Sequence, residues 1–180
     1  MKLRITLIVL AIIIVVFVAL VETRPADFRV SRSATIAAPP ATLFAQVNDL
    51  HKFQDWSPWA KLDPNGKTTF EGPAAGTGST FTWSGNSQVG EGRMTIIESR
   101  PNELVQMKLE FLKPFKATDT AEFTFEPVGN ETKVTWSMFG KNTFLSKTIS
   151  LFMDCDKMVG PEFEKGLASM KAIAEGQTKQ

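Results

Sequence analysis

Few side chains in this 180-residue chain have the chemistry of acid–base catalysis or metal binding. His51 is the only histidine. A dyad with Asp49 or Asp55 is conceivable, because a residue four positions along a helix shares its face. The polar neighbours of His51 favour a solvated helix surface instead. One histidine and one distant cysteine, Cys155, also argue against a zinc or other transition-metal site, so no metal and no cofactor is expected.

The remaining ionisable groups do not assemble into a catalytic set. Cys155 lies between Asp154 and Asp156, and neighbouring carboxylates raise the pKa of a thiol rather than activate it. We therefore expect a partly buried small residue. The acidic residues of the alternating segments lie mostly opposite the apolar positions, as solvated strand residues: Glu91, Glu98, Glu110, Glu122 and Glu126. No catalytic residue is identified, so the sequence favours a binding protein over an enzyme.

A glycine-rich stretch, residues 72–79, has the composition of a phosphate-binding loop. It lacks the Gly-Lys-Ser/Thr ending of such loops, and it leads into a strand pattern rather than a helix. Without a helix N-terminus to receive an anion, the stretch is predicted to be a turn.

The N-terminal segment determines where these residues work. Residues 5–21 are almost continuously apolar and would form about 25 Å of helix, at the short end of what crosses a bilayer. Lys2 and Arg4 precede the run, which predicts a cytoplasmic N-terminus and a domain on the periplasmic or extracellular side. We therefore expect a single-pass anchor over residues 1–23 and a domain over residues 24–180. The linker, residues 22–27, is short enough to hold the domain on the bilayer.

Two alternatives to the anchor are a cleaved signal peptide and a buried helix. A signal peptide usually has an apolar region of about 7–15 residues and a small-x-small cleavage site, of which Ala19-Leu20-Val21 is a poor version. No cysteine follows the run directly, which excludes lipidation at a processed N-terminus.

The remaining part, about 155 residues, can build one domain with a sizeable core. Without Lys2 and Arg4, 18 basic and 19 acidic side chains remain, so neither a nucleic-acid surface nor a polybasic membrane patch is expected. A single cysteine cannot form an intramolecular disulfide, so the core alone must hold the fold. The chain has 14 Phe, 4 Trp and 7 Met but no Tyr, a composition that favours an apolar interior.

Hydrophobic periodicity predicts an α+β order of elements. Residues 28–36 alternate as a strand, Pro39-Pro40 opens a helix, and Asn48-Asp49 can cap a second short helix that ends at Pro58. Residues 67–140 alternate almost throughout and contain short turns, as in an antiparallel meander with one buried face. Helical spacing follows, with an expected break at Gly160-Pro161 and then a long C-terminal helix.

Several of these segments resemble one superfamily. They are residues 38–44 and 47–59, the turn at 76–79 with the strand after it, Glu98-Ser99-Arg100-Pro101-Asn102, and the strand at 132–136. Together they resemble the START/Bet v 1-like (SRPBCC) superfamily, of the polyketide cyclase/dehydrase and lipid-transport type, over residues 28–174. The resemblance implies a helix-grip fold, in which a curved antiparallel sheet of about seven strands wraps the long C-terminal helix around an apolar cavity. It implies no catalytic constellation.

The inward faces of the predicted strands and helix give the candidate cavity residues. Predicted wall residues are Phe81, Trp83, Met94, Met107, Phe123, Trp136, Phe163, Leu167 and Met170. Each is equally suited to a solid core. Trp56 and Trp59 are predicted at the cavity mouth; alternatively, Trp56 fills the core and Trp59 packs under a loop. Arg32 shares the parity of the apolar residues of its strand, so it either meets a ligand headgroup at the mouth or lies at the sheet rim and extends to water.

These features favour a membrane-tethered domain that binds a hydrophobic small molecule or lipid, with the membrane as its second partner. One alternative is a non-catalytic protein-interaction module with a packed core and an unidentified protein partner. The other is an enzyme of the cyclase or hydrolase type. No nucleic-acid partner is expected.

Overall fold

The computed structural model describes residues 2–63 and 65–177 and has the predicted α+β helix-grip fold. The elements are, in chain order, α1 (Lys2–Glu22), β1 (Asp27–Ile36), α2 (Pro40–Asn48), α3 (Leu50–Trp56), the 3-10 helix η1 (Pro58–Lys61), β2 (Lys67–Glu71), β3 (Thr80–Ser84), β4 (Glu91–Arg100), β5 (Leu104–Lys113), β6 (Ala117–Val128), β7 (Glu131–Lys141), α4 (Phe144–Ile149) and α5 (Cys155–Gln177).

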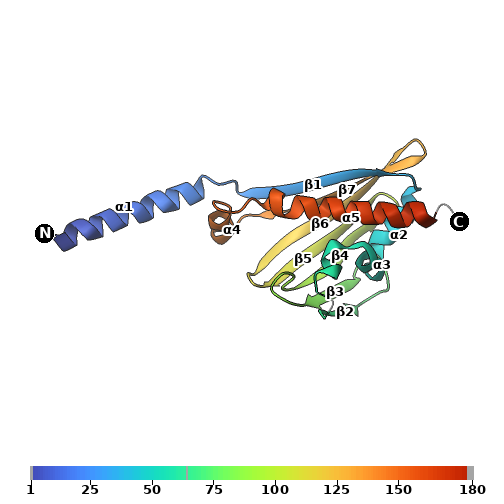
Figure 1. Cartoon of the computed structure of the whole chain (residues 1–180), viewed down its shortest axis with the longest axis horizontal. Helices are drawn as coiled ribbons and strands as arrows, with labels where there is room; N and C mark the ends of the chain where they lie inside the picture. Colours follow the sequence, from blue (N-terminus) through green and yellow to red (C-terminus); the bar gives the residue numbers. More distant parts are fainter. Residues whose placement is uncertain (1, 64, 178–180) are drawn as a thin grey trace.

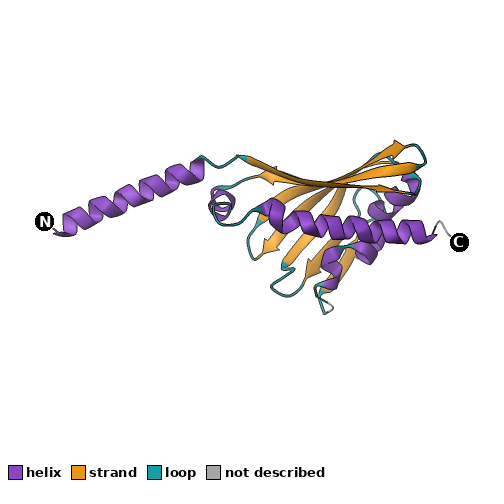
Figure 2. Ribbon diagram, turned by 45° about the horizontal axis from the view of Figure 1, so that its top comes forward, coloured by secondary structure: helices purple, strands orange, loops and turns teal. Residues whose placement is uncertain are grey.

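The seven strands form one antiparallel sheet in the order β1-β7-β6-β5-β4-β3-β2. Strands β2 to β7 form a meander, and β1 joins β7 at the opposite edge, with Phe28 opposite Gly140 and Ile36 opposite Thr132. Helices α2 and α3 connect the two edges of the sheet. Figure 1 shows α5 lying across the sheet, with β1 above it and the strands toward β2 fanning out below. Figure 2 shows that α2, α3 and α5 lie on the concave side of the sheet.

The core lies between the concave face of the sheet and the helices. Inward residues of the strands, such as Ile96, Met107 and Phe123, pack against Leu43 and Leu50 of the short helices and against the apolar face of α5. A glycine on α5 permits close approach: a Cβ at Gly166 would lie 2.7 Å from Cζ3 of Trp136 on β7. Helix α5 therefore rests directly on the sheet at this point.

The local start and stop signals act as predicted. Pro40 occupies the first turn of α2, where a missing N–H costs nothing. The carboxylate of Asp49 caps α3 by accepting from the backbone N–H of His51 at 2.9 Å. The glycine-rich stretch is the predicted turn: Gly72, Gly76 and Gly78 have φ of 82°, 80° and 91°, in the left-handed region that glycine adopts without strain.

The predicted helix break at Gly160-Pro161 is wrong, because α5 runs from Cys155 through both residues. Proline removes one helical hydrogen bond, and Arg32 of β1 contacts the helix on both sides of this position. The guanidinium of Arg32 lies against Gly160, where a Cβ would collide with it. It pairs with Asp156 before the proline and with Glu164 after it, each at 2.8 Å. Strand β1 thus holds both turns of the helix.

Helix α1 extends away from the domain (Figure 1). Among the described residues it is the one helix long and apolar enough to cross a membrane. Its side chains are exposed except for Val21 in the last turn, where α1 contacts α4. Lys147 of α4 donates to the carboxylate of Glu22 at 2.7 Å.

Candidate functional site

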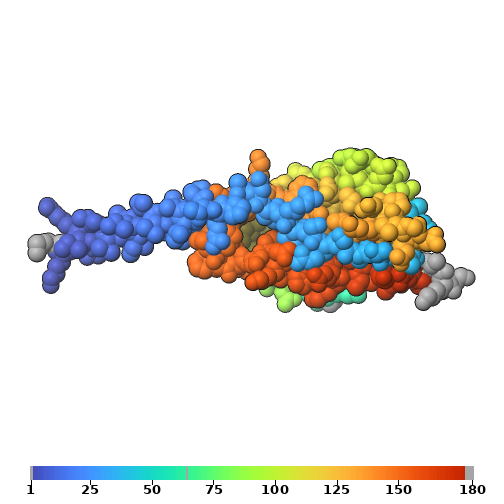
Figure 3. Space-filling model, turned by 90° about the horizontal axis from the view of Figure 1, so that it is seen from above, coloured from blue at the N-terminus to red at the C-terminus, as the bar shows by residue number. Residues whose placement is uncertain are grey.

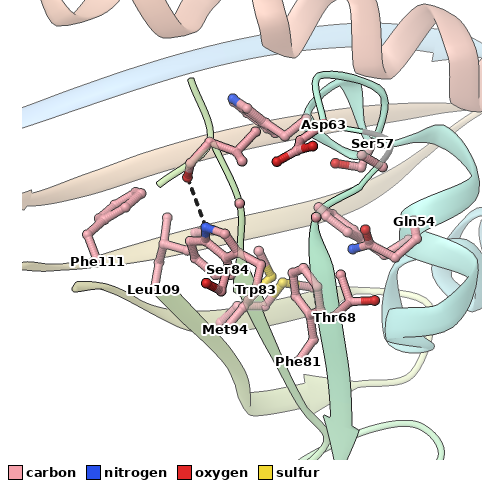
Figure 4. Close-up of a pocket in the computed structure, with 18 of the residues that line it drawn as sticks. Gln54, Ser57, Asp63, Thr68, Phe81, Trp83, Ser84, Met94, Leu109 and Phe111 are labelled. Atoms are coloured by element: carbon pink, nitrogen blue, oxygen red, sulfur yellow. Dashed lines mark hydrogen bonds between the residues drawn. The ribbon is translucent and has the colours of Figure 1, made fainter. Parts of the chain in front are cut away.

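A cavity of about 630 Å³ lies between the concave face of the sheet, α3, η1 and α5. This volume is within the range of small-molecule sites, about 300–1,000 Å³. Figure 4 shows side chains of β3, β4 and β5 on one side, including Phe81, Trp83 and Leu109, facing Ser57 and Asp63 from the region after α3. The site is therefore an interior space bounded by several separate parts of the chain.

Two aromatic stacks form much of the wall. One begins at the rim and runs inward along β2 and β3, with His51 on Phe70 at 3.9 Å, Phe70 near Phe81 at 5.7 Å and Phe81 near Trp83 at 5.5 Å. The other joins α5 to the sheet. Here Trp136 lies 4.1 Å from Phe163, almost parallel to it, and 4.8 Å from Phe123.

Seven of the nine predicted wall residues line this cavity: Phe81, Trp83, Met94, Met107, Phe123, Trp136 and Phe163. They come from β3, β4, β5, β6, β7 and α5, and the periodicity of these elements had placed them on the inward faces. The indole N–H of Trp83 donates to the carbonyl of Val89 at 3.0 Å, the dashed line of Figure 4, and this bond fixes the ring. Contact of these residues with a ligand is a prediction.

Leu167 and Met170 do not line the cavity. Both are buried in the core, where the second half of α5 packs near α2 and α3. The short helices fill that half of the concave face, so the helical stripe of α5 borders open space only at its beginning. Periodicity shows which face of a helix is buried, but not which part of that face lies against open space.

Trp56 does not lie at the mouth, whereas Trp59 lines the cavity. Trp56 is fully buried, and its indole N–H donates to the carbonyl of Gln46 at 3.0 Å, so it fills the core. Trp59 lies on η1 in edge-on contact with Trp136 and Phe163, with ring centroids 5.6 and 6.1 Å apart. Its neighbours Ala60 and Asp63 also line the cavity, on the side of the loops.

Arg32 lies outside the cavity lining, at the edge of the sheet, where it contacts α5. Its guanidinium donates twice to the carboxylate of Asp156, at 2.8 and 2.9 Å, and once to Glu164 at 2.8 Å. These hydrogen bonds raise the pKa of Arg32 and lower that of Asp156. Arg32 therefore does not meet the cavity, but it does lie at the sheet rim, on the edge strand β1 with its side chain 25% exposed. Parity did not show that acidic residues of α5 would pair with it.

The sequence analysis missed several wall residues. Leu109 and Phe111 share the face of Met107, Met138 shares that of Trp136, and Val159 precedes Phe163 by one helical turn. Their parity was a sufficient signal. The polar lining residues had no such signal, since they come from α3, from loops and from strand ends: Gln54, Ser57, Asp63, Lys67, Thr68, Ser84 and Gln88.

The carboxylate of Asp63, which lines the cavity, holds two loops together. Asp63 accepts from the backbone N–H of Asn65 at 3.1 Å and from that of Asn86 at 2.6 Å, which joins the loop after η1 to the loop after β3. His51 contacts its own cap residue Asp49 at 3.4 Å. Within residues 2–63 and 65–177, no group of three or more His, Cys, Asp or Glu side chains could hold a metal ion. The arrangement is suited to enclosing an apolar molecule.

One buried polar atom lies in this wall. Trp136 is almost fully buried, and its indole N–H has no hydrogen-bond acceptor in the described part of the chain. Its edge-on neighbours Trp56 and Trp59 offer ring faces, which are weak acceptors. The surroundings of Trp136 are therefore largely aromatic.

Comparison with known proteins agrees with this geometry. A family model described as polyketide cyclase / dehydrase and lipid transport matches residues 27–175. Among solved structures, protein CV1439 from Chromobacterium violaceum is 13% identical, with a TM-score of 0.59, 84% of this chain covered and 99% of the other. Aha1 from Colwellia psychrerythraea, solved as a dimer, is 17% identical (TM-score 0.58; 82% and 96% covered). Ara h 8.0201 is 14% identical (TM-score 0.55; 86% and 99% covered). No curated protein sequence matches the chain. These structures share the helix-grip fold.

Proposed function

This chain belongs to the polyketide cyclase / dehydrase and lipid transport family, and we propose that it is a membrane-tethered binding domain for a hydrophobic small molecule or lipid. Residues 1–23 anchor the chain in the membrane and residues 24–180 form the binding domain. The domain lies on the periplasmic or extracellular side, with the N-terminus in the cytoplasm.

The observation that carries the proposal is the cavity itself. A solid core would have made the protein-interaction alternative the better one. Instead about 630 Å³ remain open beneath α5, and the inner wall is built of aromatic, aliphatic and Met side chains. Binding an apolar ligand against this wall contributes about 25 cal/mol of favourable free energy for each Å² of apolar area, on the protein and on the ligand, that is removed from water. Flexible Met94 and Met107 can adapt to an irregular molecule.

The distribution of polar groups supports binding of a molecule with one polar end. His51, Gln54, Lys67 and Gln88 lie at the rim, whereas the interior wall holds no charged side chain among the residues described. A ligand with an apolar body and a polar end would bury the body and leave the other end among these groups. Catalysis is the weaker alternative, because the carboxylate of Asp63 already accepts two backbone N–H groups.

Native mass spectrometry of residues 24–180 tests the proposal. This part contains the whole hydrophobic core, from Val30 to Ala174, and should fold without α1. We expect a stoichiometric apolar adduct, either co-purified or acquired from a lipid extract, which organic extraction then identifies. A domain that stays free of adduct after such incubation contradicts the proposal and favours an interaction module.

A further inference from the structure

The membrane-proximal end of the domain carries an exposed apolar segment that the cavity does not use. The segment, residues 144–153, comprises α4 and the turn that leads to α5. Phe144, Leu145, Phe152 and Met153 are 49%, 48%, 81% and 48% exposed. Four large apolar side chains in ten residues form a concentrated patch, and such patches on soluble domains mark interaction surfaces.

Charge is almost absent from this stretch. Between Asn142 and Met153 the sequence has one charged residue, Lys147. Its side chain is only 13% exposed, and its ammonium pairs with Glu22 at 2.7 Å. Its charge is therefore compensated, and the segment presents apolar and hydroxyl-bearing side chains to its surroundings.

The same ion pair places the segment relative to the bilayer. Glu22 is the last residue of α1, and the side chains before Val21 are exposed along the apolar helix. A bilayer that covers α1 must end near Glu22, where charge first follows the apolar run. Phe144 and Leu145 precede Lys147 by three and two residues, within about 5 Å along the helix axis. They therefore lie at the level where α1 leaves the hydrocarbon.

A second part of the chain reaches the same end of the domain. Strand β1 begins here, with Asp27 opposite Lys141 at the end of β7, and Phe139 of β7 lies opposite Thr120 near the start of β6. The turn between β5 and β6 is therefore on this side, where Leu112 at the end of β5 and Phe115 in the turn are exposed. Figure 3 shows a surface hollow at this end, bordered by α4 and the starts of β1 and α5.

We propose that residues 144–153 lie in the interface of the membrane that α1 spans, and that an apolar ligand passes beside them between the bilayer and the cavity. The inference rests on the proposed function. The cavity extends toward this end of the domain, because Phe111 near the end of β5, Met138 near the end of β7 and Val159 near the start of α5 all line it. An amphipathic segment of this kind buries its apolar side about 5–10 Å into the boundary between headgroups and acyl chains.

The test measures the depth of residue 152 in the full chain, reconstituted in vesicles of phosphatidylcholine and phosphatidylglycerol. Phe152→Cys in a Cys155→Ser background receives an environment-sensitive fluorophore. The matched control is Val128→Cys at the end of β6, at the opposite end of the sheet and 48% exposed. We expect a blue-shifted emission at 152 and several-fold stronger quenching by headgroup-level spin-labelled lipid than at 128. Equal quenching at the two positions overturns the inference. A blue shift that depends on protein concentration, without lipid quenching, overturns it in favour of a second copy of the chain.

A kinetic measurement separates this inference from the proposed function. Phe152→Asp and Val128→Asp are compared for uptake of an anthroyloxy-labelled fatty acid from the same vesicles. We expect a several-fold slower uptake for Phe152→Asp, with an unchanged amount of probe bound at equilibrium. Equal uptake rates contradict a passage beside the segment. If neither variant nor the parent chain binds any probe, the proposed function fails, while the depth measurement still decides the position of the segment.

Discussion

Asp119 is an ionisable group on the concave face that the cavity does not use. It lies on β6, on the same face as Ala121 and Phe123, over Gly140, where a Cβ would collide with its carboxylate. The described residues give it no hydrogen bond or ion pair, and burial raises its pKa to about 6. Burial, followed by the charge of Asp119, also raises the pKa of Cys155 at the start of α5. The carboxylate therefore costs stability when it is ionised.

We expect Asp119→Asn to stabilise the domain at neutral pH. The pKa of Asp119 is about 6 in the folded state against 3.8 for an ordinary aspartate, so the folded protein loses stability as pH rises from about 4 to 6 and does not regain it above. Because the carboxylate is partly exposed, solvent screens part of the free energy that corresponds to this shift in pKa, and we expect Asp119→Asn to raise the free energy of unfolding by about 1 kcal/mol at neutral pH. Urea unfolding of residues 24–180 on both sides of this window measures it. A gain of the same size at low and at neutral pH would contradict the assignment.

Leu109 provides a test of the cavity at the level of one side chain. It lines the cavity from β5, whereas Leu112, three residues further on, is exposed at the end of the same strand. Leu109→Trp should fill the space and weaken binding of an apolar probe at least about tenfold, which corresponds to 1.4 kcal/mol. Leu112→Trp is the matched control and should bind as the parent chain does. Equal affinities for the two variants would show that the probe binds elsewhere.

Helix α5 uses a glycine for its close contact with Trp136 on the sheet. At Gly166 a new Cβ would lie 2.7 Å from Trp136 and 3.2 Å from Cδ of Pro58, so the helix would have to shift. At Gly176, near the end of the same helix, a Cβ would meet no described atom within 4 Å. The pair separates packing from helix propensity.

We expect opposite effects from alanine at these two glycines. Overpacking at Gly166 costs about 1–3 kcal/mol, which exceeds the gain of about 1 kcal/mol from replacing a helical glycine. Gly166→Ala should therefore lower the free energy of unfolding, whereas Gly176→Ala should raise it by up to about 1 kcal/mol. Chemical denaturation of both variants measures this. Two stabilised variants would mean that α5 does not rest on Trp136 as tightly as described.

The elements were the most predictable part of this molecule. Strict alternation in residues 105–111 predicts a strand with one buried face, and Pro40 and Asp49 mark the starts of the short helices. The hydrophobic period of a helix or strand does not show which other element packs against its buried face. Leu167 has the same helical spacing as Phe163, yet α2 and α3 occupy the space opposite it. Pro161 is a stop signal in the sequence, yet the helix continues through it and packs Phe163 in the core, which no local pattern shows.

The whole chain consists of an exposed apolar helix and a domain that contact each other through α4. This contact could not be predicted, since Glu22 and Lys147 are separated by 125 residues and neither position has a pattern of its own. The apolar run, by contrast, is evident in the sequence and forms the predicted helix over Lys2–Glu22. An apolar helix that is exposed to this extent is stable only inside a bilayer, unless it is cleaved off. Whether α1 is retained therefore decides whether the cavity lies next to a membrane.

We expect the mature protein to retain α1 and to expose its domain on the side opposite the cytoplasm. Lys2 and Arg4 precede the span and only Arg24 follows it closely, a difference that favours a cytoplasmic N-terminus. In the Cys155→Ser background, Val128→Cys should react with a membrane-impermeant maleimide on intact cells, and Leu3→Cys only after permeabilisation. The membrane fraction should contain a chain of 19.9 kDa. The reverse labelling pattern would place the cavity in the cytoplasm, and a soluble, shortened chain would identify a signal peptide. Removal of α1 would also take the bilayer away from α4, whereas a reversed orientation would leave α4 beside the opposite face of the membrane, because the contact between α1 and α4 is the same in both orientations.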